Sequence, residues 1–149
     1  MKVSELMTWD VLTVEEGTSL EDAARLMRDF NLGLLPIKQG ERMVGVVTDR
    51  DIAVKATAMG LDPREMAVGA VMTREVFCCH RDDDVLAAAR LMAARRLRRL
   101  PVLDDSWRLA GLLSLADLAR AHRPGLCGWV LEQITRRNSP DDWPLQSVA

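Results

Sequence analysis

A hydroxyl and a carboxylate recur in the chain three residues apart, as Thr48 with Asp51 and as Ser114 with Asp117. Each pair follows an apolar run and is predicted to open a helix, where residues i and i+3 share one face. A hydroxyl can donate to an anion, a carboxylate only accepts hydrogen bonds, and the free N–H groups at a helix start favour a phosphate. Such residues also serve as plain helix caps in many folds. Their repetition at one spacing favours contact with a ligand.

Several arginines lie near these pairs, most of them in the second copy. Arg95, Arg96, Arg98 and Arg99 lie within five residues, and Arg50 lies inside the first hydroxyl–carboxylate pair. Positive side chains at a helix end are usually solvated and suit the helix dipole, which is our interpretation of the first two. The next two enter a predicted strand, and a guanidinium can bind phosphate through two parallel hydrogen bonds. We predict phosphate contact for Arg99; for Arg50, phosphate contact and a solvated position are equal alternatives.

Cys78-Cys79-His80 is the one sequence that sets metal- or redox-active side chains side by side. Neighbouring residues of a strand face opposite sides, so two adjacent thiols do not easily reach one ion. The Cys-x-x-Cys spacing of zinc sites is absent, and only Cys127 and His122 remain elsewhere. We therefore interpret both adjacent cysteines as half-buried strand residues, and keep a metal- or redox-responsive role as a minor alternative.

The composition is that of a globular protein with little net charge. The 149 residues are 48% hydrophobic, the net charge is -2 at pH 7, and the sequence pI is about 5.7. This balance argues against a general nucleic-acid binder, and no apolar run approaches the roughly 20 residues of a membrane-spanning helix. The first residues carry no apolar leader, and three cysteines form no disulfide framework. We expect a cytoplasmic protein without membrane contact.

The chain is a tandem duplication. Residues 3–37 match residues 68–102 at a constant offset of 65, and Ala23-Ala24-Arg25-Leu26-Met27 falls on an identical run at 88–92. After one inserted residue the offset becomes 66. This offset aligns Gly45 with Gly111, and the first hydroxyl–carboxylate pair with the second. Such self-similarity predicts two equivalent structural units. Each unit is too small to bury both faces of its sheet, so we expect the two to pack against each other.

Each copy is predicted to fold as β-α-β-β-α. In the first copy we expect strands at 11–14, 34–38 and 43–48, a helix from Thr18 or Ser19 that Gly33 ends, and a second helix from 48–51. In the second copy we expect strands at 76–79, 99–103 and 109–113, and a helix from Asp83 or Asp84. We predict repeat one at 1–56, a linker at 57–67, repeat two at 68–122 and an extension at 123–149, with a helix at 129–137 before a frayed tail. The fold class is mixed α/β (α+β), with two repeats packed as a pseudo-twofold pair.

These residues resemble a known family. The duplicated Val-x-x-x-Met-Thr opening, the strand Gly33-Leu34-Leu35-Pro36 and the run from Gly45 to Ile52 are similar to the CBS-domain pair, or Bateman module, over about residues 3–122. Thr-Asp-Arg-Asp-Ile in copy one with Arg-Arg-Leu-Pro-Val in copy two resembles short stand-alone bacterial proteins of the hypoxic-response type, which implies a role in a stress response. The resemblance implies a regulatory protein that binds AMP, ADP or ATP, or alternatively NAD or S-adenosylmethionine, between the copies.

The family signature combines a Gly-h-h-Pro strand, where h is apolar, with a later Gly-x-x-Thr/Ser-x-x-Asp. In the second copy, Arg98 and Arg99 stand in place of the glycine and the first apolar residue of the Gly-h-h-Pro strand. We therefore expect the two clefts to bind ligands with unequal affinity. The two aspartates suit the ribose hydroxyls, and strand residues can form an apolar slot for adenine. The predicted nucleotide-binding residues are Thr13, Val14, Leu34, Leu35, Pro36, Thr48, Arg50, Asp51, Cys79, Arg99, Leu100, Pro101, Ser114 and Asp117.

Two other functions are alternatives to this one. An enzyme would need a nucleophile with its base, paired carboxylates or a metal, and His80 and His122 have no Ser or Cys that recurs with them. We therefore predict no catalysis and no catalytic cofactor. A ligand-free module that only dimerises stays open, because a fold does not define a function. We expect a homodimer whose pairs meet through their helices as a flat disc, with Trp129 in the core or at the subunit contact, and a separate effector protein.

Overall fold

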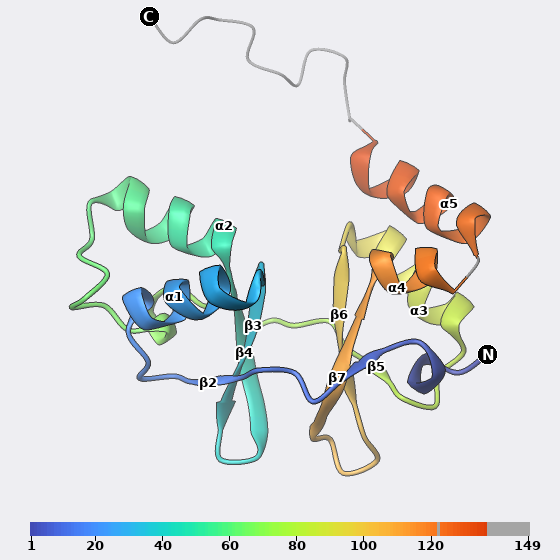
Figure 1. The fold of residues 1–149 in the computed structure, drawn as a ribbon, viewed down its shortest axis with the longest axis horizontal. Helices are drawn as coiled ribbons and strands as arrows, with labels where there is room; N and C mark the ends of the chain where they lie inside the picture. Colours follow the sequence, from blue (N-terminus) through green and yellow to red (C-terminus); the bar gives the residue numbers. More distant parts are fainter. Residues whose placement is uncertain (122, 137–149) are drawn as a thin grey trace, which may run out of the picture.

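The computed structural model describes residues 1–121 and 123–136. It confirms the predicted mixed α/β fold with a pseudo-symmetric pair of repeats. The hairpins of the two halves stand next to each other at the centre, and the helices lie towards the outer sides (Figure 1). Over the described ranges, no helix combines the length and the hydrophobicity needed to cross a membrane.

The elements repeat in the same order in both halves. The first half contains β2 (Val14–Glu15), α1 (Leu20–Phe30), β3 (Leu34–Gln39), β4 (Arg42–Thr48) and α2 (Asp49–Asp51), which continues as a π-helical turn (Ile52–Ala56) and a 3₁₀ turn (Thr57–Met59). The second half contains a 3₁₀ turn (Val68–Ala70), β5 (Cys79–His80), α3 (Val85–Arg95), β6 (Arg99–Leu103), β7 (Leu109–Ser114), α4 (Leu115–Arg120) and α5 (Pro124–Thr135). A 3₁₀ turn (Val3–Glu5) and β1 (Thr8–Trp9) precede both halves.

The four hairpin strands lie where the sequence predicts them, within one residue at each end. The sheet orders are β2-β3-β4 and β1-β7-β6-β5; β2 and β5 are parallel to their neighbours, and the hairpins are antiparallel. The predicted first strands, at 11–14 and 76–79, are wrong: each copy forms a two-residue strand that begins at the last residue of the predicted range. In the first copy only Val14 and Glu15 of this stretch pair with β3, and in the second copy only Cys79 and His80 pair with β6.

The N-terminal segment of each copy crosses to the other half. β1 pairs with β7, with Thr8 opposite Leu112, and Thr73 forms an isolated bridge with Val46. The buried side chains follow the same exchange: Val3 and Met7 lie in the core of the second half, whereas Val68, Val71 and Met72 lie in the core of the first. Each core is therefore completed by residues of the other copy.

Gly45 and Gly111 permit this crossing. A Cβ atom on Gly45 would lie 2.7 Å from the carbonyl oxygen of Thr73, and one on Gly111 would overlap the carbonyl oxygen of Thr8. A larger residue at either place would push the crossing segment away from the sheet, which is why glycine marks a close backbone approach within a strand. The glycine of the repeated motif thus has a packing reason that is independent of any ligand.

The equivalent helices α1 and α3 begin at predicted caps, and α1 ends earlier than predicted. Ser19 accepts a hydrogen bond from the Asp22 backbone, and Asp84 accepts one from the backbone of Leu86. The prediction that Gly33 ends α1 is wrong, because Asn31 takes the left-handed conformation there (φ 52°). Asparagine enters this region at low cost, since its short side chain can hydrogen-bond locally.

Helix α5 packs on α3 and α4 and belongs to the second half alone (Figure 1). Its Val130 is fully buried in the second core. On α3, Ala89 is 0% exposed and Ala93 is buried, while the equivalent Ala24 and Arg28 of α1 are exposed. The extra helix at 129–137 therefore exists, but it begins at Pro124, a favourable first helical residue, and ends at Thr135. The predicted tail from 138 onward lies outside the described residues.

Candidate functional site

A cleft of about 880 Å³ lies between the two halves. Its lining consists of equivalent stretches from both copies, residues 31–34 and 96–99, together with residues 48–50 at the start of α2. The first two stretches are related by the 65-residue offset of the duplication. The residues that lead into β3 in the first copy and into β6 in the second copy therefore line one shared space.

The cleft is positively charged. Arg50, Arg98 and Arg99 line it with exposed side chains, and within residues 1–121 and 123–136 none of the three forms an ion pair. A Cβ atom on Gly33 would lie 3.5 Å from Nη1 of Arg99, so this guanidinium from β6 reaches the first copy's strand. Three guanidinium groups that form no ion pair favour an anionic ligand, above all a phosphate.

An apolar recess of about 310 Å³ adjoins the charged cleft. Leu32 and Leu34 line both spaces, and the far side of the recess includes Leu12, Phe30 and Leu112. A further recess of about 250 Å³ connects Arg98 and Arg99 to Ser114 and to Leu131 of α5. An apolar recess beside a positive cleft suits a ligand with a flat ring at one end and an anionic group at the other.

The two hydroxyl–carboxylate pairs form reciprocal caps at the starts of α2 and α4. The Thr48 backbone N–H donates to Oδ2 of Asp51 at 3.0 Å, and the Asp51 N–H donates to Oγ1 of Thr48 at 3.0 Å. Ser114 and Asp117 repeat the arrangement. The capping role that the sequence offered for these residues is therefore present in the structure, and contact with a ligand would have to be additional to it.

Each capping carboxylate is nearly buried and faces a cation of its own helix. Asp51 is 9% exposed and pairs with Lys55 at 2.9 Å; Asp117 is 3% exposed and pairs with Arg120. A carboxylate has about four acceptor positions, so each retains capacity for a further donor. In each case the cation contacts Oδ1 of the aspartate, so a ribose hydroxyl would have to share Oδ1 with the cation or displace the cation.

The other predicted residues divide between the cleft and the protein interior. Leu34, Thr48, Arg50 and Arg99 line the charged cleft, and Ser114 lines the recess beside it. Strand alternation turns their neighbours away, because successive residues face opposite sides of a sheet. Thr13 is half-buried in the segment before β2. The remaining predicted residues are buried in the two sheets, and these are Val14, Leu35, Pro36, Cys79, Leu100 and Pro101.

Sequence reasoning missed several residues that line these spaces, among them Leu12, Leu32, Asp49 and Leu112. Signals in the sequence could have identified Leu112 and Asp49. Leu112 lies two positions before Ser114, on the same face of β7, and Asp49 lies between the hydroxyl and the carboxylate of the first pair.

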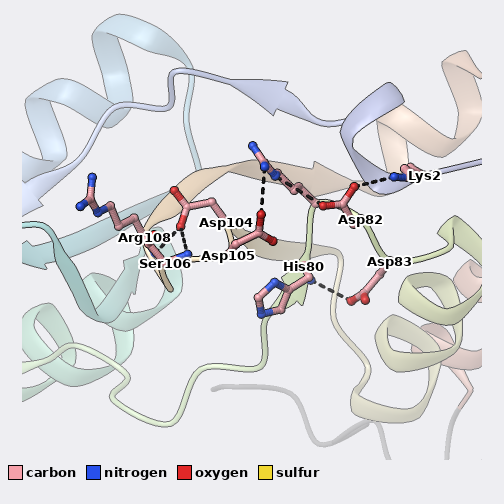
Figure 2. Close-up of polar contacts among 9 residues, drawn as sticks. Lys2, His80, Asp82, Asp83, Asp104, Asp105, Ser106 and Arg108 are labelled. Carbon is pink, nitrogen blue, oxygen red and sulfur yellow. Dashed lines mark hydrogen bonds and ion pairs between the residues drawn. The ribbon is translucent and has the colours of Figure 1, made fainter.

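The structure gives no support to the metal- or redox-responsive alternative. Cys79 is buried in the second core, and burial raises the pKa of Cys78 to about 11 and that of Cys79 to about 12, so both remain thiols at neutral pH. The carboxylates that follow His80 in the chain have partners within the protein. Oδ2 of Asp83 accepts the backbone N–H of His80, and Asp82 pairs with Lys2, as Figure 2 shows. In the part of the chain that the structure describes, no three His, Cys, Asp or Glu side chains group so that they could hold one metal ion.

A family comparison agrees with the architecture. The model of the CBS domain matches residues 3–56 and 68–123. The chain therefore belongs to the CBS domain family and contains a pair of such domains. CBS domain pairs are generally regulatory ligand-binding modules.

The chain is similar to several stand-alone CBS proteins. It is 37% identical over 117 residues to the CBS domain-containing protein YhcV of Bacillus subtilis, which covers 78% of this chain and 82% of the relative. It is 34% identical to Hypoxic response protein 1 of Mycobacterium tuberculosis, over 80% of this chain and 83% of the relative. The resemblance to stand-alone proteins of the hypoxic-response type is thus confirmed.

Two solved structures share the fold. The crystal structure of Hypoxic Response Protein I with two coordinated zinc ions has a TM-score of 0.74 and 32% identity, over 80% of this chain and 98% of that chain. The CBS domain pair of protein MJ0100, in complex with 5'-methylthioadenosine and S-adenosyl-L-methionine, has a TM-score of 0.73 and 28% identity, over 84% of this chain and 98% of that chain.

Proposed function

We propose that this chain is a cytoplasmic, non-catalytic regulator that binds an adenine nucleotide between its two CBS domains and signals to a separate effector protein. The observation that carries the proposal is the cleft with three guanidinium groups free of ion pairs, beside an apolar recess. The complex of the MJ0100 pair with two adenosine compounds supports a nucleoside ligand. S-adenosylmethionine has a positive sulfonium and no phosphate, so the arginines favour AMP, ADP, ATP or NAD over it.

The three spaces suggest how such a nucleotide lies. Adenine fits the apolar recess between Leu34 and Leu112, and the phosphates fit the cleft at Arg99. The ribose then lies between them, near Ser114, which lies two residues beyond Leu112 on β7. In this arrangement Asp117 accepts the ribose hydroxyls with the acceptor capacity that its cap leaves. The duplication would give Asp51, which caps α2 with the cleft-lining Thr48, the same role for a second nucleotide.

A thermal-shift series tests the proposal. A ligand at 100 times its dissociation constant stabilises the folded state by about 2.7 kcal/mol, provided that it does not bind the unfolded chain. We expect ATP, ADP and AMP to raise the melting temperature, and adenosine and S-adenosylmethionine to raise it less at equal concentration. GTP is the control for the base, because its guanine carries different edge groups. A melting temperature that none of these compounds changes would favour the ligand-free dimerising module.

The surfaces of the helices carry a second prediction, that of a homodimer. Met59 after α2 is 72% exposed, and Trp129 and Leu131 on α5 are 41% and 43% exposed. Because α5 covers α3 and α4, a partner that approaches the second half through the helices would contact α5 instead. We expect light scattering at micromolar concentration to give twice the chain mass of 16.6 kDa, and Trp129→Ser to shift the protein towards the single-chain mass. A wild-type protein of single-chain mass would contradict the prediction.

A further inference from the structure

Asp49 places a carboxylate inside the positively charged cleft. Its side chain is exposed and lines the cleft together with Arg50, Arg98 and Arg99. A Cβ atom on Gly33 would lie 3.4 Å from Oδ2 of Asp49 and 3.5 Å from Nη1 of Arg99. The carboxylate of one copy and the guanidinium of the other therefore flank the same point of the cleft.

The fold makes little use of this carboxylate. Oδ1 of Asp49 accepts the backbone N–H of Arg50 at 2.8 Å, and Asp49 forms no ion pair with any described residue. The helix cap at this place is Thr48, with Asp51 as its reciprocal partner. The second copy has the apolar Leu115 at the position of Asp49, so the carboxylate distinguishes the two copies.

A carboxylate in a phosphate site repels the ligand unless a cation accompanies the phosphates. Mg²⁺ prefers oxygen ligands, and it usually binds through one or two carboxylates together with the phosphates of a substrate, while it keeps several water molecules. Within residues 1–121 and 123–136 no group of three His, Cys, Asp or Glu side chains could hold an ion. A cation at Asp49 would therefore arrive with the nucleotide.

We propose that Asp49 contributes its carboxylate to the Mg²⁺ ion of a magnesium–nucleoside triphosphate whose phosphates lie against Arg99. This inference rests on the proposed function and specifies its ligand: the cleft selects the magnesium complex of ATP over the free tetra-anion. Leu115 supplies no such oxygen, so the selection belongs to the cleft that Asp49 lines.

Calorimetric titration of ATP into the wild type and into Asp49→Asn, each with excess Mg²⁺ and with EDTA, tests the inference. Asparagine keeps an oxygen that can accept the Arg50 N–H. We expect Mg²⁺ to strengthen wild-type binding of ATP by about tenfold to a hundredfold, the range in which supporting groups of a metal site act. We expect Asp49→Asn to lose this dependence on Mg²⁺.

Two controls isolate the effect. Asp105→Asn removes an exposed carboxylate in the β6–β7 turn, where it pairs with Arg81 outside the cleft, and should keep the full dependence on Mg²⁺ (Figure 2). Adenosine, which carries no phosphate, should bind every variant equally with and without Mg²⁺. A dependence on Mg²⁺ for adenosine as well would mean that the ion acts on the protein apart from the phosphates, and would overturn the inference.

The other outcomes are equally decisive. Tighter binding of ATP to Asp49→Asn in both conditions would show that the carboxylate only repels phosphate, and an undiminished Mg²⁺ effect in this variant would place the ion elsewhere. Either result overturns the role of Asp49 and leaves the proposed nucleotide binding intact. A wild type that binds no ATP, ADP or AMP in either condition would instead remove the proposed function, and this inference with it.

Discussion

Replacing Arg99 with alanine is expected to weaken ATP binding about tenfold to a hundredfold, because a hydrogen bond to a charged group contributes about 1.5–3 kcal/mol. Arg99 lines the cleft, is exposed, and forms no ion pair within the described residues, so the fold should be unaffected. Adenosine binding should change little, and AMP should lie between the two. Calorimetry across the three ligands measures the trend and should also resolve two clefts of unequal affinity.

Arg95→Ala is the matched control for this substitution. It removes the same charge from α3, where the guanidinium stacks over Phe77 at 4.3 Å and does not line the cleft. We expect its affinity for ATP to match that of the wild type. Equal losses in Arg95→Ala and Arg99→Ala would indicate a general effect of charge, and unchanged affinities for ATP, AMP and adenosine in Arg99→Ala would show that Arg99 does not contact phosphate.

Local signals explain which parts of the fold were predictable. The hairpin strands lie within one residue of the predicted ranges because each combines apolar residues with a polar turn. Ser19 and Asp84 cap their helices because their side chains can accept a backbone N–H. The pairing of Thr8 with Leu112 depends on residues far apart in the chain, and a two-residue strand has no period to detect.

The sequence also contains a sign that an additional helix, α5, covers the second half. Ala93 of α3 stands where α1 has Arg28, and α3 has small or apolar residues on a face that α1 keeps charged. An amphipathic helix that loses its polar face in one copy indicates an additional cover in that copy. The predicted helix began at 129, whereas α5 begins at Pro124, because proline is favourable at the first position of a helix.

The candidate site was predictable as a set of motifs but not as a geometry. The repeated pairs identified Thr48, which lines the cleft between the copies, and Ser114, which lines the recess beside it in the second half. The pairing of Asp51 with Lys55 depends on the rotamers of both side chains, which the sequence does not specify. Leu35 was predicted beside Leu34, although alternation turns it towards the first core, where it is 0% exposed.

Asp51→Ala and Asp117→Ala are expected to weaken nucleotide binding in their own clefts by about tenfold to a hundredfold, which corresponds to the loss of hydrogen bonds to ribose. Each variant should also lose about 1 kcal/mol of folding free energy, because the aspartate is the reciprocal partner of the N-cap residue Thr48 or Ser114. The measurements are calorimetry and thermal unfolding on the same proteins. Ser19→Ala is the control, since it removes the cap of α1 outside the lining of the cleft and should lower stability alone.

The two roles of these aspartates separate cleanly in this comparison. If they act only as caps, all three variants should lose similar stability and bind nucleotide like the wild type. A 2′,3′-dideoxy nucleotide supplies a check without mutation, because it lacks the hydroxyls that Asp51 and Asp117 would accept. It should bind the wild type as weakly as ATP binds the aspartate variants. Equal wild-type affinities for ATP and its dideoxy analogue would leave Asp51 and Asp117 as caps paired with Lys55 and Arg120, and would remove their role in binding ribose.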